Sequence, residues 1–277
     1  MKNSGEEAVA IISDIHGNYP ALLAVISDIR RSALKVKQIW FLGDLFGYGN
    51  QIQQVFDCMN LVIKPDIWLA GNHDLAMVGN RELYSMMNEK ARSSIDESKH
   101  QITPLIQKKI ESLDTHISVS ERIPITISHG LPSKDKYESV IYYESQILSG
   151  RISASKLRNE VLPKANIWIV GHSHYQTAWL YQEKNKNWEQ LIEGFGQRLD
   201  SKKVLDVEFG EETDSKRCKE IFYADLSEGD LVILNPGSVG VPRDGDVNKV
   251  INKRVSKYLL LTFGKAKMKI EFRVIPY

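Results

Sequence analysis

Five short apolar runs, each followed at once by glycine or a polar residue, limit most strongly the folds open to this chain. The runs are AVAII (8–12), QIWFL (38–42), DIWLA (66–70), ITIS (125–128) and NIWIV (166–170). Short runs of this kind, rich in Ile, Val and Trp, are typical of strands that are buried on both faces. Helical patterns separate several of the runs, so we predict crossover connections and a largely parallel inner sheet.

The clearest helical pattern follows the first run. Asn18 suits an N-cap and Pro20 suits the first turn, and apolar residues then recur at helical spacing as far as Ile29. Residues 50–59 and 81–98 also show helical patterns. These segments predict helices packed on the faces of the sheet.

The second half of the chain has a different character. Strand-like runs separated by turns recur between residues 203 and 275, which predicts a second, mostly antiparallel sheet. Residues 181–230 are highly charged, and we predict an inserted cap or hairpin there. A solvated surface excursion is the alternative. A cap that begins just after Tyr175 and Gln176 would lie near the rim of a site at the preceding strand end and would limit substrate access.

The composition narrows the functional classes. The formal net charge is +1, so the chain lacks the overall positive charge typical of nucleic-acid binding, although a local basic strip could still bind nucleic acid. Cys58 and Cys218 lie far apart, which argues against a disulfide scaffold and favours a reducing compartment. The N-terminal stretch lacks a signal-peptide pattern, and no apolar run is long enough to span a membrane. We therefore expect a cytoplasmic protein without a membrane partner.

Side chains of the kinds that bind metals gather directly after the five apolar runs. They are Asp14, His16, Asp44, Asn72, His73, Asp74, His129, His172 and His174. Because ligands collect at the carboxyl ends of strands in α/β sheets, we expect these side chains to meet. Asp14 and His16 are one residue apart, which in an extended segment directs both to the same side.

The chemistry of this set indicates divalent ions. Carboxylate, imidazole and amide groups without cysteine suit manganese, iron, nickel or zinc. The set is too large for one tetrahedral ion, and Asp44 is able to bridge two. Each motif alone has a simpler explanation: GNHD favours a β-turn, and a single histidine after a strand is often part of a core. The argument therefore rests on the joint pattern.

The ordered motifs SDIHGN, GDLFGYG, GNHD, SHG and GHSH resemble those of the calcineurin-like metallophosphoesterase superfamily, above all its small bacterial and archaeal phosphodiesterase-type members. NPGSVGVPRDG at 235–245 adds to the resemblance, which extends from about residue 9 to 277 with 181–230 as its main gap. It implies one metallophosphoesterase domain over residues 1–277. The implied fold class is α/β, a four-layer αββα sandwich of two mixed β-sheets flanked by helices.

The resemblance also implies roles for single residues. One ion would be held by Asp14, His16, Asp44 and His174, and the second by Asp44, Asn72, His129 and His172. We expect manganese, with iron, nickel or zinc as alternatives. His73 would face the substrate phosphate as a catalytic residue, with Asp74 orienting its ring. Asn235 and Arg243 are candidate substrate contacts, unless their loop is only a structural turn.

These roles predict a dinuclear-metal-dependent phosphoesterase that hydrolyses a small phosphodiester or nucleotide-type substrate by means of a metal-bridging hydroxide. Residues 43–49 lack the Asp-Arg-Gly of serine/threonine protein phosphatases, and GNHD stands where those enzymes have Gly-Asn-His-Glu, so a protein phosphatase is disfavoured. The enzymatic alternatives are a symmetrical dinucleoside polyphosphate hydrolase and a nuclease. In a different class, the alternative is a non-catalytic metal-binding scaffold.

Overall fold

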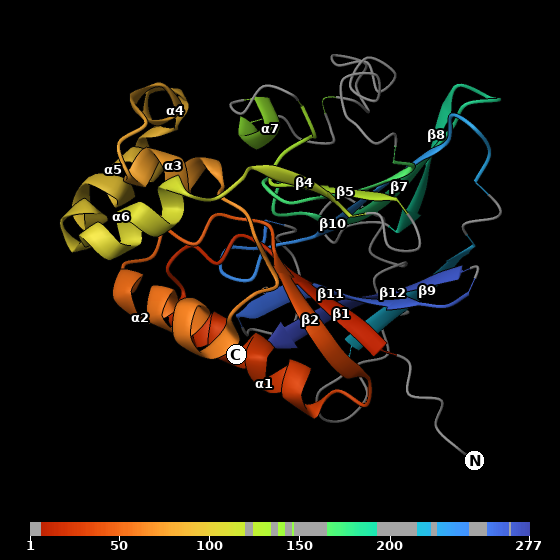
Figure 1. The fold of residues 1–277 in the computed structure, drawn as a ribbon, viewed down its shortest axis with the longest axis horizontal. Helices are drawn as coiled ribbons and strands as arrows, with labels where there is room; N and C mark the ends of the chain where they lie inside the picture. The colour runs from red at the N-terminus through yellow and green to blue at the C-terminus, as the bar shows by residue number, and fades with distance from the viewer. Residues whose placement is uncertain are drawn as a thin grey trace.

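The computed structural model describes residues 7–119, 124–133, 138–141, 146, 165–192, 215–222, 226–243, 254–265 and 267–277. Their strands form two six-stranded sheets that pack face to face, with helices outside them (Figure 1). The expected α/β fold of two mixed sheets flanked by helices is confirmed.

The first sheet has the strand order β3-β2-β1-β11-β12-β9. Its strands are β1 Glu7–Ile12, β2 Lys35–Phe41, β3 Ile67–Trp68, β9 Ser215–Phe222, β11 Val255–Phe263 and β12 Lys267–Pro276. Strands β1, β2 and β3 are parallel, whereas β11 pairs antiparallel with β1, and β12 and β9 continue antiparallel.

The second sheet has the order β4-β5-β6-β10-β7-β8. Its strands are β4 His116–Val119, β5 Ile125–Ser128, β6 Ile167–Val170, β7 Gln176–Gln182, β8 Asn187–Ile192 and β10 Leu231–Pro236. Strands β5, β6 and β10 are parallel, and β4, β7 and β8 pair antiparallel at the two sides.

The expected division between a parallel first half and an antiparallel second half is wrong. Each sheet has both a parallel and an antiparallel part. In the first sheet the later strand β11 pairs antiparallel with β1, and in the second sheet the later strand β10 pairs parallel with β6 and antiparallel with β7. A run's pattern shows that it is a buried strand, but not which strand it joins, because pairing depends on contacts far along the chain.

The core lies between the sheets and follows the two-residue alternation of the strands. Val9 and Ile11 of β1 pack into the same cluster as Ile167 and Ile169 of β6. Ala10 and Ile12 face the other way, toward the helices. Both faces of these strands are therefore buried, as their continuous apolar sequences indicate.

Helices α1 Tyr19–Arg31 and α2 Ile52–Asp57 cover the outer face of the first sheet, and α2 continues as the π-helix Cys58–Ile63 (Figure 1). The Asn18 side chain accepts a hydrogen bond from the Ala21 N–H at 3.2 Å, which confirms the predicted N-cap. No helix in the part of the chain described by the structure is long and apolar enough to cross a bilayer.

Between β3 and β4 lie four further α-helices and a short 3₁₀-helix. They are α3 Asn72–Met77, α4 Arg81–Met86, α5 Glu89–Ser98, the 3₁₀-helix Lys99–Gln101 and α6 Pro104–Glu111. The predicted helix over 81–98 is two helices, because Asn80 and Asn88 each cap a new N-terminus. Helix α7 Glu138–Ile141 lies above β4 and β5 (Figure 1).

The charged stretch 181–230 contributes to both sheets. It begins in the β7–β8 hairpin and includes β9, which pairs with β12 along its whole length. Residues 193–214 and 223–225 lie outside the described residues, and so does the strand expected near 203–209. The single domain and the inserted cap therefore stay predictions.

Candidate metal centre

All seven predicted metal ligands meet at the carboxyl ends of the strands. Asp14 and His16 follow β1, Asp44 follows β2, Asn72 begins α3 after β3, His129 follows β5, and His172 and His174 follow β6. The two sheets thus contribute ligands from opposite sides. Residues far apart along the chain become neighbours, since His16 Nε2 lies 3.0 Å from the Nε2 of His174, 158 positions later.

The donor atoms form two groups that share one carboxylate. Asp14, His16, Asp44 and His174 place donor atoms within 4.8 Å of one another, and so do Asp44, His129 and His172. Asn72 joins the second group, because its Oδ1 lies 3.1 Å from His129 Nε2. This grouping matches the two ligand sets that the family resemblance implies.

Most of these ligands have an uncommon backbone conformation. In the described residues, eight non-glycine residues have a positive φ: Asp14, His16, Asp44, Tyr48, Lys64, His172, His174 and Lys186. Five of them are predicted ligands. A left-handed conformation at such residues costs about 1–3 kcal/mol and concentrates at functional sites. Asp14 and His16 are therefore not in the extended segment expected from their spacing, and left-handed turns direct both side chains inward.

Backbone hydrogen bonds hold these turns together. The Asp14 N–H donates to Gly43 O and the His16 N–H donates to Asp44 O, each at 3.0 Å. The Gly240 N–H donates to Asp14 O at 3.0 Å. A Cβ added at Gly171 would collide with Ser13 Oγ, so this glycine is required for the close approach of the strand ends.

Three histidines are oriented by backbone carbonyl groups. Each carbonyl oxygen accepts a hydrogen bond from an imidazole Nδ1–H. Phe46 O accepts from His16 at 2.8 Å, Leu42 O from His129 at 2.9 Å and Val241 O from His174 at 2.7 Å. A carbonyl oxygen only accepts, so each Nδ1 carries the proton. Each Nε2 then points to the centre, which is the arrangement typical of metal-binding histidines.

The centre has unsatisfied electron pairs that a cation would satisfy. Asp14 Oδ1 and Asp44 Oδ2 are buried without a hydrogen-bond partner in the described part of the chain. His129 Nε2 faces Asp44 Oδ2 at 3.4 Å. An unpaired buried carboxylate oxygen is costly, and lone pairs that face each other repel unless a proton or metal ion lies between them. The residues present therefore fit divalent ions.

The charges in the centre keep its carboxylates ionised. Burial works against the ionised form of Asp44, but the positive charge of His129 holds the Asp44 pKa well below the usual range. Burial also disfavours a charged His129, yet the Asp44 carboxylate raises the His129 pKa to about 9. In the absence of metal, His129 therefore holds a proton at the position where an ion would bind.

Asp74 does not orient the His73 ring, so this expectation is wrong. Its two carboxylate oxygens accept from four backbone N–H groups, those of Asp44 (2.9 Å), Leu45 (2.8 Å), Phe46 (3.1 Å) and Gly71 (3.1 Å). Burial and the Asp44 charge raise the Asp74 pKa, while these N–H donors favour the ionised form. Asp74 is thus a positioning residue that holds the turn carrying Asp44.

His73 is buried at the edge of the centre. Its ring centroid lies 4.8 Å from that of His16, and its Nδ1 has no hydrogen-bond partner in the described residues. Burial lowers the His73 pKa, so the ring is neutral at neutral pH. A neutral imidazole keeps one donor and one acceptor nitrogen for a substrate.

The two candidate substrate contacts, Asn235 and Arg243, have different surroundings. Asn235 is fully buried, and its amide donates to Gly171 O (2.8 Å) and Ser173 Oγ (3.0 Å) while its oxygen accepts from the Gly237 N–H (2.9 Å). It holds the GHSH turn, and its assignment as a substrate contact stays a prediction. Arg243 is exposed, and its Nη2 lies 3.5 Å from Tyr48 Oη, at the edge of the centre.

Tyr48 is the site residue that sequence reasoning missed. Its ring centroid lies 4.9 Å from those of both His16 and His73. The signal was present in the motif GDLFGYG, where a bulky aromatic residue stands between two glycines in a turn.

Comparison with known proteins supports this interpretation. Residues 8–195 match the family model of calcineurin-like phosphoesterases. An uncharacterized protein of Methanocaldococcus jannaschii is 26% identical over 273 residues, covering 97% of this chain and 87% of that protein. A metallophosphoesterase from Sphaerobacter thermophilus has a similar fold, with a TM-score of 0.61 and 23% identity over 98% of this chain and 89% of that one.

The shared carboxylate predicts the effect of Asp44→Asn. The change removes the charge common to both ligand groups, so metal binding should fall from two ions per chain to one or none, measured by elemental analysis after gel filtration. The exposed Asp96→Asn is the control and should keep the full metal content. Two tightly bound ions in Asp44→Asn protein would contradict the shared-ligand assignment.

The hydrogen bonds of Asp74 predict a loss of stability in Asp74→Asn. An amide nitrogen would face backbone N–H donors, which should destabilise the metal-free protein by about 3 kcal/mol in urea unfolding. Asp230→Asn, which also loses a carboxylate bound to backbone N–H groups, should destabilise without weakening metal binding. Unchanged stability in Asp74→Asn would instead support a purely catalytic role.

The raised pKa of His129 predicts that metal binding releases a proton. At pH 7 an incoming ion must displace this proton, so the apparent metal affinity should fall by about tenfold per pH unit as pH drops below 9. Titration calorimetry in buffers with different ionisation enthalpies measures the release. His129→Gln should abolish this proton release. A metal affinity of the wild type that does not depend on pH would contradict a protonated His129 in the metal-free protein.

Proposed function

Because the chain belongs to the calcineurin-like phosphoesterase family, and is therefore a metal-dependent phosphoric ester hydrolase, we propose that it uses two ions to hydrolyse a small phosphodiester or nucleotide-type substrate. One observation carries this proposal: two converging groups of buried ligands share Asp44. Paired ions that share a ligand are suited to an in-line displacement at phosphorus.

When bound, the ions would acidify a water that they share and neutralise charge on the phosphoryl oxygens. The chain itself supplies orientation. The carbonyl groups that accept from Nδ1 prevent the rings of His16, His129 and His174 from turning, so the ligands need no rearrangement during the reaction. The fold itself therefore fixes the orientation of these three histidine ligands.

We assign His73 as the proton-handling residue. Its Nδ1 is buried without a hydrogen-bond partner among the described residues, and its neutral ring lies against His16. A substrate phosphoryl or leaving-group oxygen at the centre would therefore find a nitrogen able to donate or accept a hydrogen bond. Asp74 contributes indirectly, because it holds the turn that lies between β2 and His73.

The donor set favours manganese, with iron, nickel and zinc as alternatives, because its ligands are oxygen and imidazole nitrogen without thiolate. A protein phosphatase remains disfavoured, since residues 43–49 lack Asp-Arg-Gly. We also propose a cytoplasmic location, supported by the free, buried Cys58.

The proposal is tested by assaying metal-free protein reloaded with manganese, nickel, magnesium or zinc. We expect turnover of bis(p-nitrophenyl) phosphate, highest with manganese and faster than that of p-nitrophenyl phosphate. Asp44→Asn should lose at least about 100-fold in kcat/KM, whereas Asp96→Asn should match the wild type. No turnover of any phosphorus ester with any of the metals would overturn the proposal, and faster monoester turnover would overturn the diester preference.

A further inference from the structure

Tyr48 is in an unfavourable conformation that none of the roles described so far explains. It has a φ of 59°, and a left-handed backbone is a genuine outlier for a bulky residue. The other positive-φ residues of the centre are predicted metal ligands, but a tyrosine between Gly47 and Gly49 does not belong to either ligand group. Strain of this kind at an active site motivates a functional assignment for Tyr48.

The surroundings of Tyr48 fix its position at the edge of the metal centre. Its ring meets His16 edge-on at 4.9 Å and lies tilted against His73 at 4.9 Å. The turn is closed by a hydrogen bond of 2.9 Å from the Gly49 N–H to His16 O. A Cβ at Gly47 would collide with the His73 ring, so the turn packs tightly on this histidine.

Two cationic side chains from separate parts of the chain converge on Tyr48. Lys90, in the first turn of α5, places Nζ 5.8 Å from the ring centroid. Arg243, which follows β10, places Nη2 3.5 Å from the phenol oxygen, and its backbone N–H lies 3.5 Å from His174 O. Both are exposed, and neither forms an ion pair with any carboxylate that the structure describes.

We propose that Tyr48, Lys90 and Arg243 form a subsite for a second phosphoryl group of the substrate, beside the ester phosphate that is cleaved. Two cations and a phenol hydroxyl suit a multiply charged group with several acceptor oxygens better than a single carboxylate. The inference rests on the proposed function and narrows its substrates to esters that carry an additional phosphoryl group.

The same geometry disfavours a nucleobase as the group read here. Bases bind to proteins by stacking on an open aromatic face. The Tyr48 ring lies against His73, and Lys90 lies over the ring. A stacked base would have to displace one of these side chains, whereas an anionic group would bind between the existing cations.

The test uses two substrates with the same reacting ester. Thymidine 5′-(p-nitrophenyl phosphate) and its 3′-phosphorylated form differ only in the second phosphoryl group. Manganese-loaded wild-type protein should prefer the 3′-phosphorylated compound. Lys90→Gln and Arg243→Gln should each lower this preference by about tenfold, mainly through KM. Tyr48→Phe should lower it less, because only the hydroxyl is lost.

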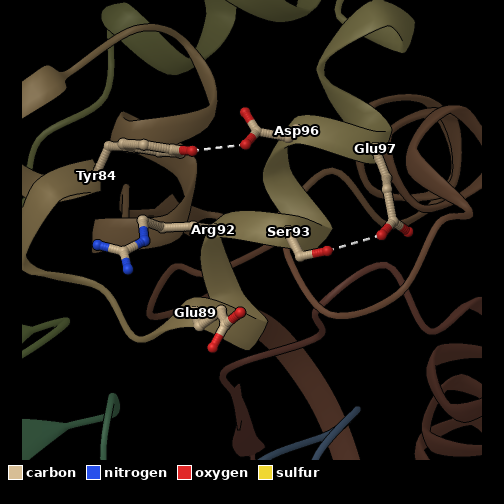
Figure 2. Close-up of a pocket in the computed structure, with 6 residues that line it drawn as sticks. All are labelled: Tyr84, Glu89, Arg92, Ser93, Asp96 and Glu97. Atoms are coloured by element: carbon tan, nitrogen blue, oxygen red, sulfur yellow. Dashed lines mark hydrogen bonds between the residues drawn. The ribbon is translucent and has the colours of Figure 1, made fainter.

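The matched control is Arg92→Gln. Arg92 lies on the same helix as Lys90 but lines a different pocket, together with Tyr84, Glu89, Ser93, Asp96 and Glu97 (Figure 2). This variant should retain the wild-type preference. Equal losses for both substrates in Lys90→Gln and Arg243→Gln, or a preference that survives both changes, would overturn the subsite.

A binding measurement separates this inference from the proposed function. In calorimetry with the manganese-loaded protein, inorganic pyrophosphate should bind more tightly than orthophosphate, and Lys90→Gln with Arg243→Gln should remove most of that difference. If no phosphorus ester is hydrolysed with any of the metals, the proposed function fails while this binding difference still decides the subsite. An unchanged pyrophosphate advantage in the double variant would refute the subsite even in an active enzyme.

Discussion

The centre depends on hydrogen bonds from imidazole Nδ1–H groups to backbone carbonyls. These bonds turn the Nε2 lone pairs of His16, His129 and His174 toward the buried oxygens of Asp14 and Asp44. Such an arrangement is costly without a positive charge at its centre. The left-handed turns and buried carboxylates thus destabilise the folded state. Only protons or metal ions bound in the site offset this cost.

Two buried polar side chains hold the halves of this arrangement from opposite sheets. Asp74 binds four N–H groups in the turns after β2 and β3, and Asn235 binds the turn after β6. These hydrogen bonds all go to the turns that carry predicted metal ligands. Both residues lie beside predicted site residues, which is why a motif alone does not distinguish a positioning role from a catalytic one.

The strands and the gathering of the candidate ligands could be predicted from the sequence, whereas the residues that hold those ligands in place could not. Runs such as 8–12 and 166–170 are apolar on both faces, and the residue types that follow them are those of metal ligands. The pairing of β11 beside β1 depends on contacts more than 200 residues apart along the chain. The left-handed backbone of Asp14 and the contacts of Asp74 follow from packing that no local pattern encodes, whereas the position of Tyr48 between two glycines was a local signal.

The most direct measurement is a crystal structure of manganese-loaded protein with anomalous diffraction data. The account predicts two manganese peaks that share Asp44, with one beside His16 and His174 and the other beside His129. Each of these three histidines should bind through Nε2 and keep its Nδ1 contact with a backbone carbonyl. A single peak, or coordination through Nδ1 after a ring has turned, would contradict the account.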